Sequence, residues 1–349
     1  MHNSIASTAA KFQPPPGAQT ICTLDMHTGG EPLRIVTGGL PHLPGRTVLE
    51  KRAWFRAHFD SIRTALMWEP RGHADMYGAV VTPSSETRGA FDVFFLHNEG
   101  YSTMCGHAIL ALTKYVAEAG LVPVSGGKAH AVFHVPAGRI DATAFCENGV
   151  VQHSVFRNVP SFVLRRNAVV DVPGLGAVTL DVAYGGAFYA LVDSSCHGLT
   201  IDPANAATFV DLGRRIKSSV ARALSIDHPF EPELSFLYGV IFTGPPVMPG
   251  HHSRNVCVFA DGEIDRSATG SGVSARAALH VARAELALGE PAVIESIAGS
   301  TMRVTAVEQV MFGPYSAIIP EVGGSAHYTG RHEFWIDPSD PMRKGFLVR

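Results

Sequence analysis

The sequence predicts an α/β protein built from two similar domains. The chain has 349 residues, of which 46% are apolar, a length that suits about two ordinary globular domains. Two buried helices are predicted at residues 106–119 and 271–288, each after a strand and a glycine-containing turn. The residues that lead them, Cys105 and Thr269, are 164 positions apart, about half the chain. This spacing indicates an internal duplication of one fold unit.

Residues 1–18 are predicted to be a disordered leader. Pro14, Pro15 and Pro16 are consecutive, and three prolines in a row stop both helix and sheet formation. We place the first α/β domain at residues 19–158. Its short apolar runs, such as GAVVTP and FDVFFLHN, are bounded by Gly, Pro, Asn or Ser and are typical of strands in a mixed sheet or barrel.

The two predicted helices read GHAILALTKYVAEA and SGVSARAALHVARAELAL. Both are apolar on nearly every side, which places a helix inside a domain and not on its surface. Gly120 with Pro123 ends the first helix, and Gly289 with Pro291 ends the second.

The boundary between the domains is predicted around residues 156–163. Asn158 and Pro160 interrupt a strand-like run there. We place the second α/β domain at residues 159–324. The closing segment, 325–349, has aromatic and turn residues well after the second helix, and we expect it to return to the first domain.

The charge balance favours a small-molecule ligand. The formal net charge is -3 and no long Lys/Arg run occurs, so nothing attracts nucleic acid or an anionic membrane. No segment has the roughly 18 consecutive apolar residues that a membrane span needs. Because the first twenty residues also lack an apolar targeting core, we expect a soluble, cytoplasmic protein. The sequence leaves open whether it acts as a homodimer.

The sequence predicts neither a cofactor nor a metal ion. The five cysteines are odd in number, scattered, and never spaced as C-x-x-C, so neither a disulfide framework nor a zinc site is indicated. No dinucleotide-binding glycine motif follows a strand, and no lysine signature for pyridoxal phosphate is present. His251 and His252 fall in a loop, PGHHSRN, where we expect solvent exposure and no metal.

Cys105 is the candidate catalytic residue at the first helix start. Unpaired backbone N–H groups and the positive end of the helix dipole favour a thiolate there, so we expect a lowered pKa and a role as base or nucleophile. The same N–H groups, exposed by Gly106 and Gly270, form a cradle for a carboxylate. A small buried hydrophobe is the alternative for a free cysteine.

Thr269 stands at the equivalent position of the second helix. A threonine hydroxyl without an adjacent base exchanges protons poorly near neutral pH, so capping and substrate hydrogen bonding suit it better. Asp265 could pair with a substrate ammonium group or with the neighbouring Arg266. His107 could hydrogen-bond the substrate or only complete the helix start. His27 could help to shape the pocket or stabilise a turn; we favour the turn and leave it out of the predicted site.

Four motifs resemble those of the proline racemase family. They are DMHTGGEPLRIV (residues 25–36), MCGHAILAL (104–112), DRSATGSG (265–272) and TGRHEFWIDPSDP (329–341), in that order and over nearly all of the chain after the leader. The resemblance implies the diaminopimelate epimerase-like fold, in which two α/β domains each wrap a sheet around a central helix with the active site between them. It also implies substrate-binding roles for Gly106, His107, Asp265, Gly270 and Ser271.

The residue at position 269 separates two activities within that family. The resemblance implies a cysteine at both helix starts in the racemases and epimerases of the family. This sequence instead has Cys105 at the first start and Thr269 at the second. That pair is similar to the branch that dehydrates trans-3-hydroxy-L-proline, as are AYGGAFYALV (183–192) and HNEGYSTMCGH (97–107). The resemblance therefore implies a hydro-lyase with Cys105 as base. A proline racemase or 4-hydroxyproline epimerase, and a non-catalytic imino-acid-binding protein, are the alternatives.

Overall fold

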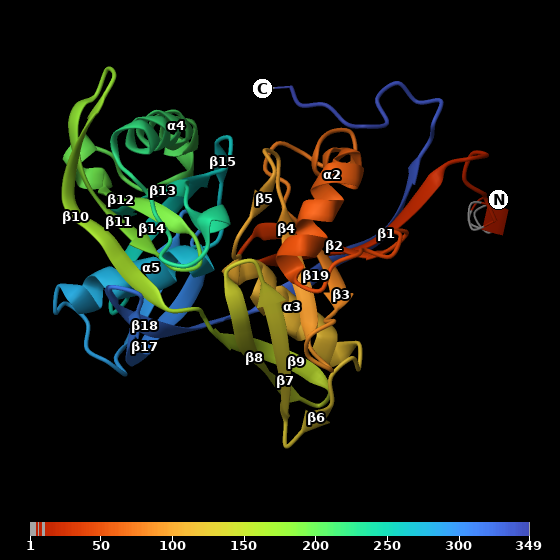
Figure 1. Ribbon diagram of the computed structural model, residues 1–349, viewed down its shortest axis with the longest axis horizontal. Coiled ribbons are helices and arrows are strands. Elements are labelled where there is room, and N and C mark those ends of the chain that lie inside the picture. Colours follow the sequence, from red (N-terminus) through yellow and green to blue (C-terminus); the bar gives the residue numbers. More distant parts are fainter. Residues whose placement is uncertain (1–4, 6, 9–10, 349) are drawn as a thin grey trace.

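Strands form two closed barrels that lie side by side (Figure 1). The computed structural model describes residues 5, 7–8 and 11–348. Within these residues, nineteen strands make one continuous hydrogen-bonded network. A single helix runs through the middle of each barrel and a second helix covers it from outside.

The first barrel comes mainly from the N-terminal half of the chain. Its strands are β1 (Gln19–Thr28), β2 (Glu31–Gly38), β3 (Gly78–Pro83), β4 (Phe91–Leu96), β5 (Tyr101–Ser102), β6 (Val124–Ser125), β7 (Lys128–Val135), β8 (Gly138–Glu147) and β9 (Val150–Arg157). Strand β19 (Ala326–Ile336) returns from the far end of the chain and pairs antiparallel with β1. Because β18 pairs with β9 and leads directly into β19, this pair of strands closes the barrel.

The second barrel takes the rest of the chain. Its strands are β10 (Ser161–Val172), β11 (Gly176–Tyr184), β12 (Phe188–Asp193), β13 (Leu237–Gly244), β14 (Ser253–Phe259), β15 (Glu263–Ile264), β16 (Pro291–Ser296), β17 (Thr301–Phe312) and β18 (Tyr315–Gly324). Pairing of β10 with β18 closes this barrel. Three 3₁₀ turns accompany it: η1 (Ser194–His197), η2 (Pro203–Asn205) and η3 (Pro232–Leu234).

The same order of elements occurs in both barrels. Helix α2 (Val48–Met67) connects the parallel strands β2 and β3, and helix α4 (Ala206–Ala223) connects the parallel strands β12 and β13. The central helix then joins a second parallel pair, β4 with β7 in one barrel and β14 with β16 in the other. The prediction of two similar α/β domains with buried central helices is confirmed.

The central helices are α3 (Gly106–Glu118) and α5 (Gly270–Ala282). Nearly every residue of each is buried, because strands surround both helices on all sides. Helix α5 is shorter than predicted. Ala284 takes a left-handed backbone with φ 58°, and Glu285 N donates to His280 O at 2.9 Å, so the helix ends well before Gly289.

The outer helices were not predicted. Helix α4 buries Phe209, Leu212, Ile216 and Val220 along one face, with the helical spacing that defines an amphipathic helix. Helix α2 begins with a capping box, in which Glu50 N donates to Thr47 Oγ1 at 3.2 Å and the Glu50 carboxylate accepts in return. None of the helices in the described part of the chain is both long and apolar enough to cross a membrane.

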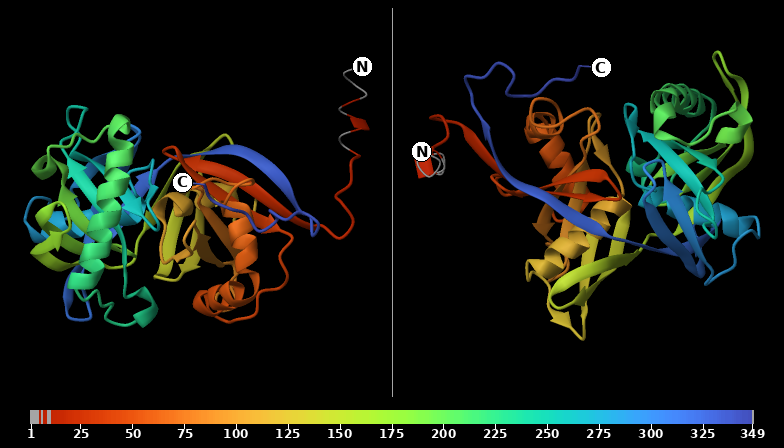
Figure 2. Two further views of the ribbon diagram at one scale, coloured as in Figure 1. Left: turned by 90° about the horizontal axis from the view of Figure 1, so that it is seen from above. Right: turned by 180° about the vertical axis from the view of Figure 1, so that it is seen from behind.

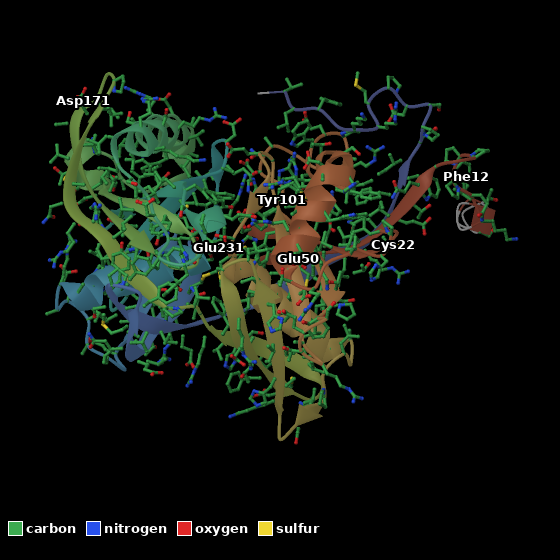
Figure 3. The ribbon with its side chains drawn as sticks, viewed as in Figure 1. Phe12, Cys22, Glu50, Tyr101, Asp171 and Glu231 are labelled. Atoms are coloured by element: carbon green, nitrogen blue, oxygen red, sulfur yellow. The ribbon has the colours of Figure 1, made fainter. Side chains whose placement is uncertain are left out.

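The segments that precede β1 and follow β19 both extend from the β1–β19 strand pair of the first barrel (Figure 2). The predicted disordered leader covers residues 1–18. Residues 1–4, 6 and 9–10 of this leader lie outside the described residues. Phe12, at the far end of the molecule in Figure 3, stacks on Trp335 with ring centroids 5.7 Å apart. The N-terminal segment therefore contacts the end of β19.

Candidate active site

The central helices of the two barrels meet at their N-termini. A Cβ atom on Gly106 would lie 2.5 Å from the Gly270 Cα, and one on Gly270 would lie 2.6 Å from the Gly106 Cα. No other residue fits at either position without moving a backbone, so both helix starts require glycine. The first turns of α3 and α5 thus bring their unpaired N–H groups to one place between the barrels.

A closed cavity of about 20 Å³ lies at this meeting point, enough for roughly one water molecule. All seven predicted site residues line it, together with residues from both barrels: Tyr77, Met104, Cys105, Gly106, His107, Tyr189, Tyr238, Phe259, Asp265, Thr269, Gly270 and Ser271. The structure therefore brings together predicted site residues that are up to 166 positions apart in the sequence. Their roles in catalysis and binding stay predictions.

The Cys105 thiol is buried and held in its position by neighbours on α3. Its Sγ lies 3.1 Å from His107 Nδ1. Burial raises the pKa of the thiol well above its usual range, and the carboxylates of Asp265 and Glu31 raise it further, while the Ala108 amide and the Tyr77 hydroxyl oppose the rise. The expectation of a lowered pKa is wrong for this closed site, because burial outweighs the helix N-terminus.

His107 is neutral beside this thiol. Burial lowers the pKa of its imidazole, although a hydrogen bond to the Pro32 backbone and the charge of Asp265 oppose the change. Thr28 Oγ1 donates to His107 O at 2.9 Å and fixes the backbone of the residue. A neutral imidazole that donates one N–H to a carbonyl has its other nitrogen available to accept the Cys105 proton.

The Thr269 hydroxyl donates a hydrogen bond to Asp265. Thr269 Oγ1 donates to Asp265 Oδ2 at 2.8 Å, while Asp265 Oδ1 accepts from Ser267 N at 2.7 Å. Arg266 turns away and pairs with Asp75 at 2.9 Å, so the alternative of an Asp265–Arg266 ion pair is not formed. The Asp265 carboxylate remains in the cavity, buried and oriented by two hydrogen bonds.

A sequence profile described as proline racemase matches residues 23–347. The chain belongs to the proline racemase family. A relative named trans-3-hydroxy-L-proline dehydratase from Colwellia psychrerythraea is 48% identical, with both chains covered completely. A human relative of the same name is 46% identical over 96% of each chain.

Solved structures of the proline racemase family share the architecture. A hydroxyproline epimerase from Agrobacterium vitis with bound trans-4-hydroxy-L-proline is 29% identical and superimposes with a TM-score of 0.89, covering 95% of this chain and 96% of that one. A probable proline racemase from Agrobacterium radiobacter with bound carbonate is 32% identical, also with a TM-score of 0.89, over 94% and 96% of the two chains. The expected fold of the family is confirmed.

Sequence reasoning missed the aromatic wall of the cavity. Tyr77, Tyr189, Tyr238 and Phe259 line it from strands or strand ends in both barrels. Tyr189 lies within AYGGAFYALV, which had been noted only as a motif, while the others stand in ordinary apolar runs. An aromatic residue in such a run looks the same whether it faces a core or a cavity, so no local signal distinguishes the two.

Glu31 was also missed, although it belongs to the first quoted motif. It is fully buried, and its Oε2 accepts from Arg266 N of the other barrel at 2.8 Å. Burial and the nearby charge of Asp265 raise the pKa of this carboxyl well above its usual range. Glu31 therefore links the two barrels through a hydrogen bond from the residue that follows Asp265.

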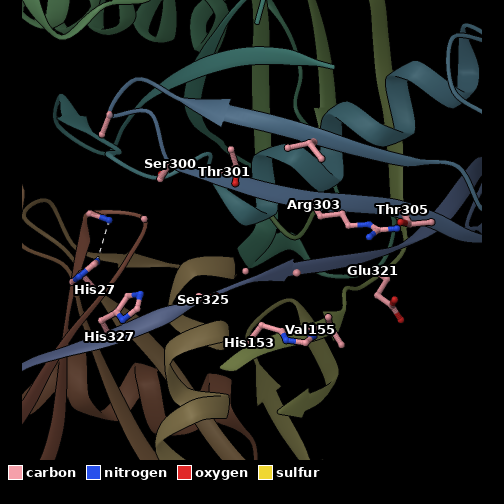
Figure 4. A pocket seen from close by; sticks show the side chains of 16 residues that line it. His27, His153, Val155, Ser300, Thr301, Arg303, Thr305, Glu321, Ser325 and His327 are labelled. Atoms are coloured by element: carbon pink, nitrogen blue, oxygen red, sulfur yellow. Dashed lines mark hydrogen bonds between the residues drawn. The ribbon is translucent and has the colours of Figure 1, made fainter. Parts of the chain in front are cut away.

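A separate groove of about 940 Å³ runs between the barrels on another side (Figure 4). His27 and His327 lie in it with ring centroids 5.2 Å apart, and none of the predicted site residues lines it. His27 Nδ1 accepts from Gly30 N at 3.2 Å, which is the expected turn contact.

His251 and His252 are half-buried, which corrects the expectation of exposure. His251 Nδ1 lies 2.8 Å from Glu295 Oε1, because the loop folds back onto β16, and the His252 ring packs on His280. Within residues 5, 7–8 and 11–348, no three His, Cys, Asp or Glu side chains come together as metal ligands.

Proposed function

We propose that this chain is a trans-3-hydroxy-L-proline dehydratase, a hydro-lyase that forms 1-pyrroline-2-carboxylate. The observation that carries the proposal is the pair of opposed helix starts with a thiol on one side and, on the other, a hydroxyl whose proton is bound to a carboxylate. The names of the 43–48% identical relatives support the same substrate.

The substrate is held by its two charged groups. Its carboxylate lies against the N–H groups at the starts of α3 and α5, where two helix dipoles favour an anion. Its secondary ammonium pairs with Asp265, whose carboxylate is oriented by Ser267 and Thr269. Together these contacts fix the ring so that one face is turned toward Cys105 and the other toward Thr269.

The stereochemistry of the substrate explains why one thiol is enough. In trans-3-hydroxy-L-proline the carboxylate and the hydroxyl lie on opposite faces of the ring, so the α-hydrogen and the hydroxyl share one face. Cys105 as thiolate removes the α-proton, the C3–O bond breaks, and the resulting thiol returns the same proton to the leaving oxygen as water forms. The enamine product then tautomerises to 1-pyrroline-2-carboxylate.

The surrounding residues support each part of this elimination. His107 Nδ1, 3.1 Å from the sulfur, accepts a hydrogen bond from the Cys105 thiol and fixes the position of the sulfur. The helix N–H groups stabilise the negative charge that develops on the carboxylate as the α-carbon is deprotonated. Because the closed cavity is smaller than a five-membered ring with its substituents, the barrels separate to admit the substrate and close around it.

Incubation of the purified protein with proline derivatives tests the proposal. The panel is trans-3-hydroxy-L-proline, cis-3-hydroxy-L-proline, trans-4-hydroxy-L-proline and L-proline, with the ketimine detected after reduction and the amino acids separated on a chiral column. We expect ketimine from trans-3-hydroxy-L-proline alone. D-Proline or an epimer of 4-hydroxyproline as the main product would instead assign the protein to the isomerases of its family.

A further inference from the structure

The hydroxyl of Tyr238 differs from the other tyrosine hydroxyls of the cavity. Tyr77 OH hydrogen-bonds Ser102 Oγ, and Tyr189 OH hydrogen-bonds Ser271 Oγ at 2.7 Å. Tyr238 OH is buried and has no hydrogen-bond partner among the residues that the structure describes. The Tyr238 hydroxyl is therefore the one tyrosine hydroxyl lining the described cavity that lacks a hydrogen-bond partner.

An unpaired buried hydroxyl has an energetic cost. Leaving a polar group buried without a partner destabilises a protein. A phenylalanine would fill the same space between Phe259 and Tyr189 without this cost, since it differs only by the oxygen. The hydroxyl is thus explained if something that enters the cavity hydrogen-bonds it.

The Tyr77 side chain connects the surroundings of the Tyr238 hydroxyl to those of Cys105. The Tyr238 hydroxyl lies beside the Tyr77 hydroxyl, although the two oxygens do not meet the geometry of a hydrogen bond. The Tyr77 ring packs edge-on against His107 with ring centroids 5.0 Å apart, and His107 Nδ1 lies 3.1 Å from the Cys105 sulfur. On the other side of the cavity the polar groups of Thr269 and Ser271 are already paired.

We propose that Tyr238 is a specificity-determining residue whose phenol donates a hydrogen bond to the 3-hydroxyl oxygen of the substrate. The inference rests on the proposed dehydration, in which the α-hydrogen and the 3-hydroxyl both face Cys105. Because the hydroxyl leaves on that face, its oxygen comes to the side of the cavity where Tyr238 has an unused donor.

The hydrogen bond assists the leaving group without any net proton transfer from Tyr238. Cys105 takes the α-proton, the C3–O bond breaks, and the oxygen receives that proton from the Cys105 thiol to leave as water. Burial raises the pKa of Tyr238 well above its usual range, so its phenol remains protonated and able to donate throughout. L-Proline lacks this oxygen, and in cis-3-hydroxy-L-proline it points to the opposite face.

The substitution Tyr238→Phe tests the assignment, with Tyr184→Phe as its matched control. The hydroxyl of Tyr184 is likewise buried without a partner in the described ranges, but it packs among Phe162 and Phe188 in the second barrel and does not line the cavity. We expect Tyr238→Phe to lower kcat/KM for trans-3-hydroxy-L-proline at least tenfold. Tyr184→Phe should remain within twofold of the wild type.

Binding measurements separate recognition of the hydroxyl from a structural effect. In the Cys105→Ala protein, which cannot turn the substrate over, calorimetry should show tighter binding of trans-3-hydroxy-L-proline than of its cis isomer or of L-proline. Adding Tyr238→Phe should remove this preference and leave the Kd of L-proline within twofold. The comparison of the three ligands in the Cys105→Ala protein does not require a change at Tyr238. It therefore still tests the inference if the Tyr238→Phe variant does not fold.

Three outcomes would overturn the inference while leaving the proposed function intact. The first is a wild-type protein that dehydrates the substrate and a Tyr238→Phe protein that does so equally well. The second is equal binding of the trans and cis isomers by the Cys105→Ala protein, and the third is that Tyr238→Phe weakens the binding of L-proline as much as that of trans-3-hydroxy-L-proline. A wild-type protein that forms no ketimine at all would instead refute the proposed function, and this inference with it.

Discussion

Helices α3 and α5 occupy equivalent places in the two barrels, yet the residues that precede them differ in chemistry and in backbone. Cys105 has an extended backbone with φ -142°, and its thiol contacts the neutral ring of His107. Thr269 has a left-handed backbone with φ 64°, which is uncommon for a β-branched residue, and its hydroxyl is bound to Asp265. The scaffold is repeated in the two barrels, while one end carries the thiol that we propose exchanges a proton and the other carries a hydroxyl that orients a carboxylate.

The largest difference between the two ends should follow removal of the thiol. Cys105→Ala eliminates the proposed base, so kcat should fall by about 10²–10⁴-fold or more, since this is the usual contribution of a positioned acid–base group. Steady-state kinetics with trans-3-hydroxy-L-proline measure the loss. Cys146→Ala, which removes a half-buried thiol on β8, is the control and should retain full activity. Turnover by Cys105→Ala within tenfold of the wild type would disprove the assignment.

The next largest effect should come from the carboxylate on the Thr269 side. Asp265→Asn removes the charge that we propose pairs with the substrate ammonium, so kcat/KM should fall by roughly 10- to 150-fold, equivalent to roughly 1.5–3 kcal/mol. Asp75→Asn breaks the pair with Arg266 outside the cavity and provides the comparison. Equal losses in both variants would mean that Asp265 acts only through the loop that carries Arg266.

The pH dependence of kcat should show the ionisation of a single group, the Cys105 thiol at the start of α3. Because the folded protein raises the pKa of Cys105, the thiol is protonated at neutral pH, and kcat should rise with pH by about tenfold per unit until the thiol ionises. Because the pKa of His107 is lowered, its ring stays neutral, and the pH profile of kcat should show no second ionisation near the usual pKa of histidine. Thr269→Ala should have a profile of the same shape. A flat profile between pH 6 and about 9, beyond the usual thiol pKa, would show that thiolate formation does not limit the reaction.

The smallest effect should follow removal of the threonine hydroxyl. Thr269→Ala loses one hydrogen bond to Asp265 and no proton-transfer group, so dehydration should slow by less than about tenfold. Wild-type protein given L-proline in deuterium oxide should correspondingly form no D-proline, and any α-deuterium should enter with retained configuration. Accumulation of D-proline at a rate comparable to dehydration would contradict the comparison. Cys257, buried beside Thr269, would then be the group to replace next.

The sequence predicted the central part of this molecule better than its periphery. Helix α3 was predicted to within a residue, because its apolar surface and the turn at Gly120 both result from burial inside a barrel. Helix α4 was missed although Phe209, Leu212, Ile216 and Val220 have helical spacing, since its polar face hides the pattern. The end of α5 was misplaced because Ala284, a good helix former, takes a left-handed turn that only the neighbouring structure imposes.

The candidate site was predictable where it depends on local sequence. The glycines and the residues before them, Cys105 and Thr269, stand at helix starts that can be located from the sequence. The aromatic wall and the raised pKa of Cys105 were not predictable, because both arise from strands of the two barrels closing over the thiol. Burial by distant segments determines both the aromatic wall and the pKa of Cys105, and the spacing of residues along the chain does not reveal which segments will bury the thiol.

The continuous strand pair β18–β19 sets the order in which the two barrels can close during synthesis. Strand β1 pairs with β2 along one edge, and its other edge pairs with β19, where Gln19 faces Ile336, so the chain must be synthesised as far as residue 336 before the first barrel can close. Until then β1 has an unpaired edge, which is the kind of surface that seeds aggregation. On the ribosome, the domain that emerges first is therefore the one that is finished last, and a chain cut off before residue 326 would leave it permanently open.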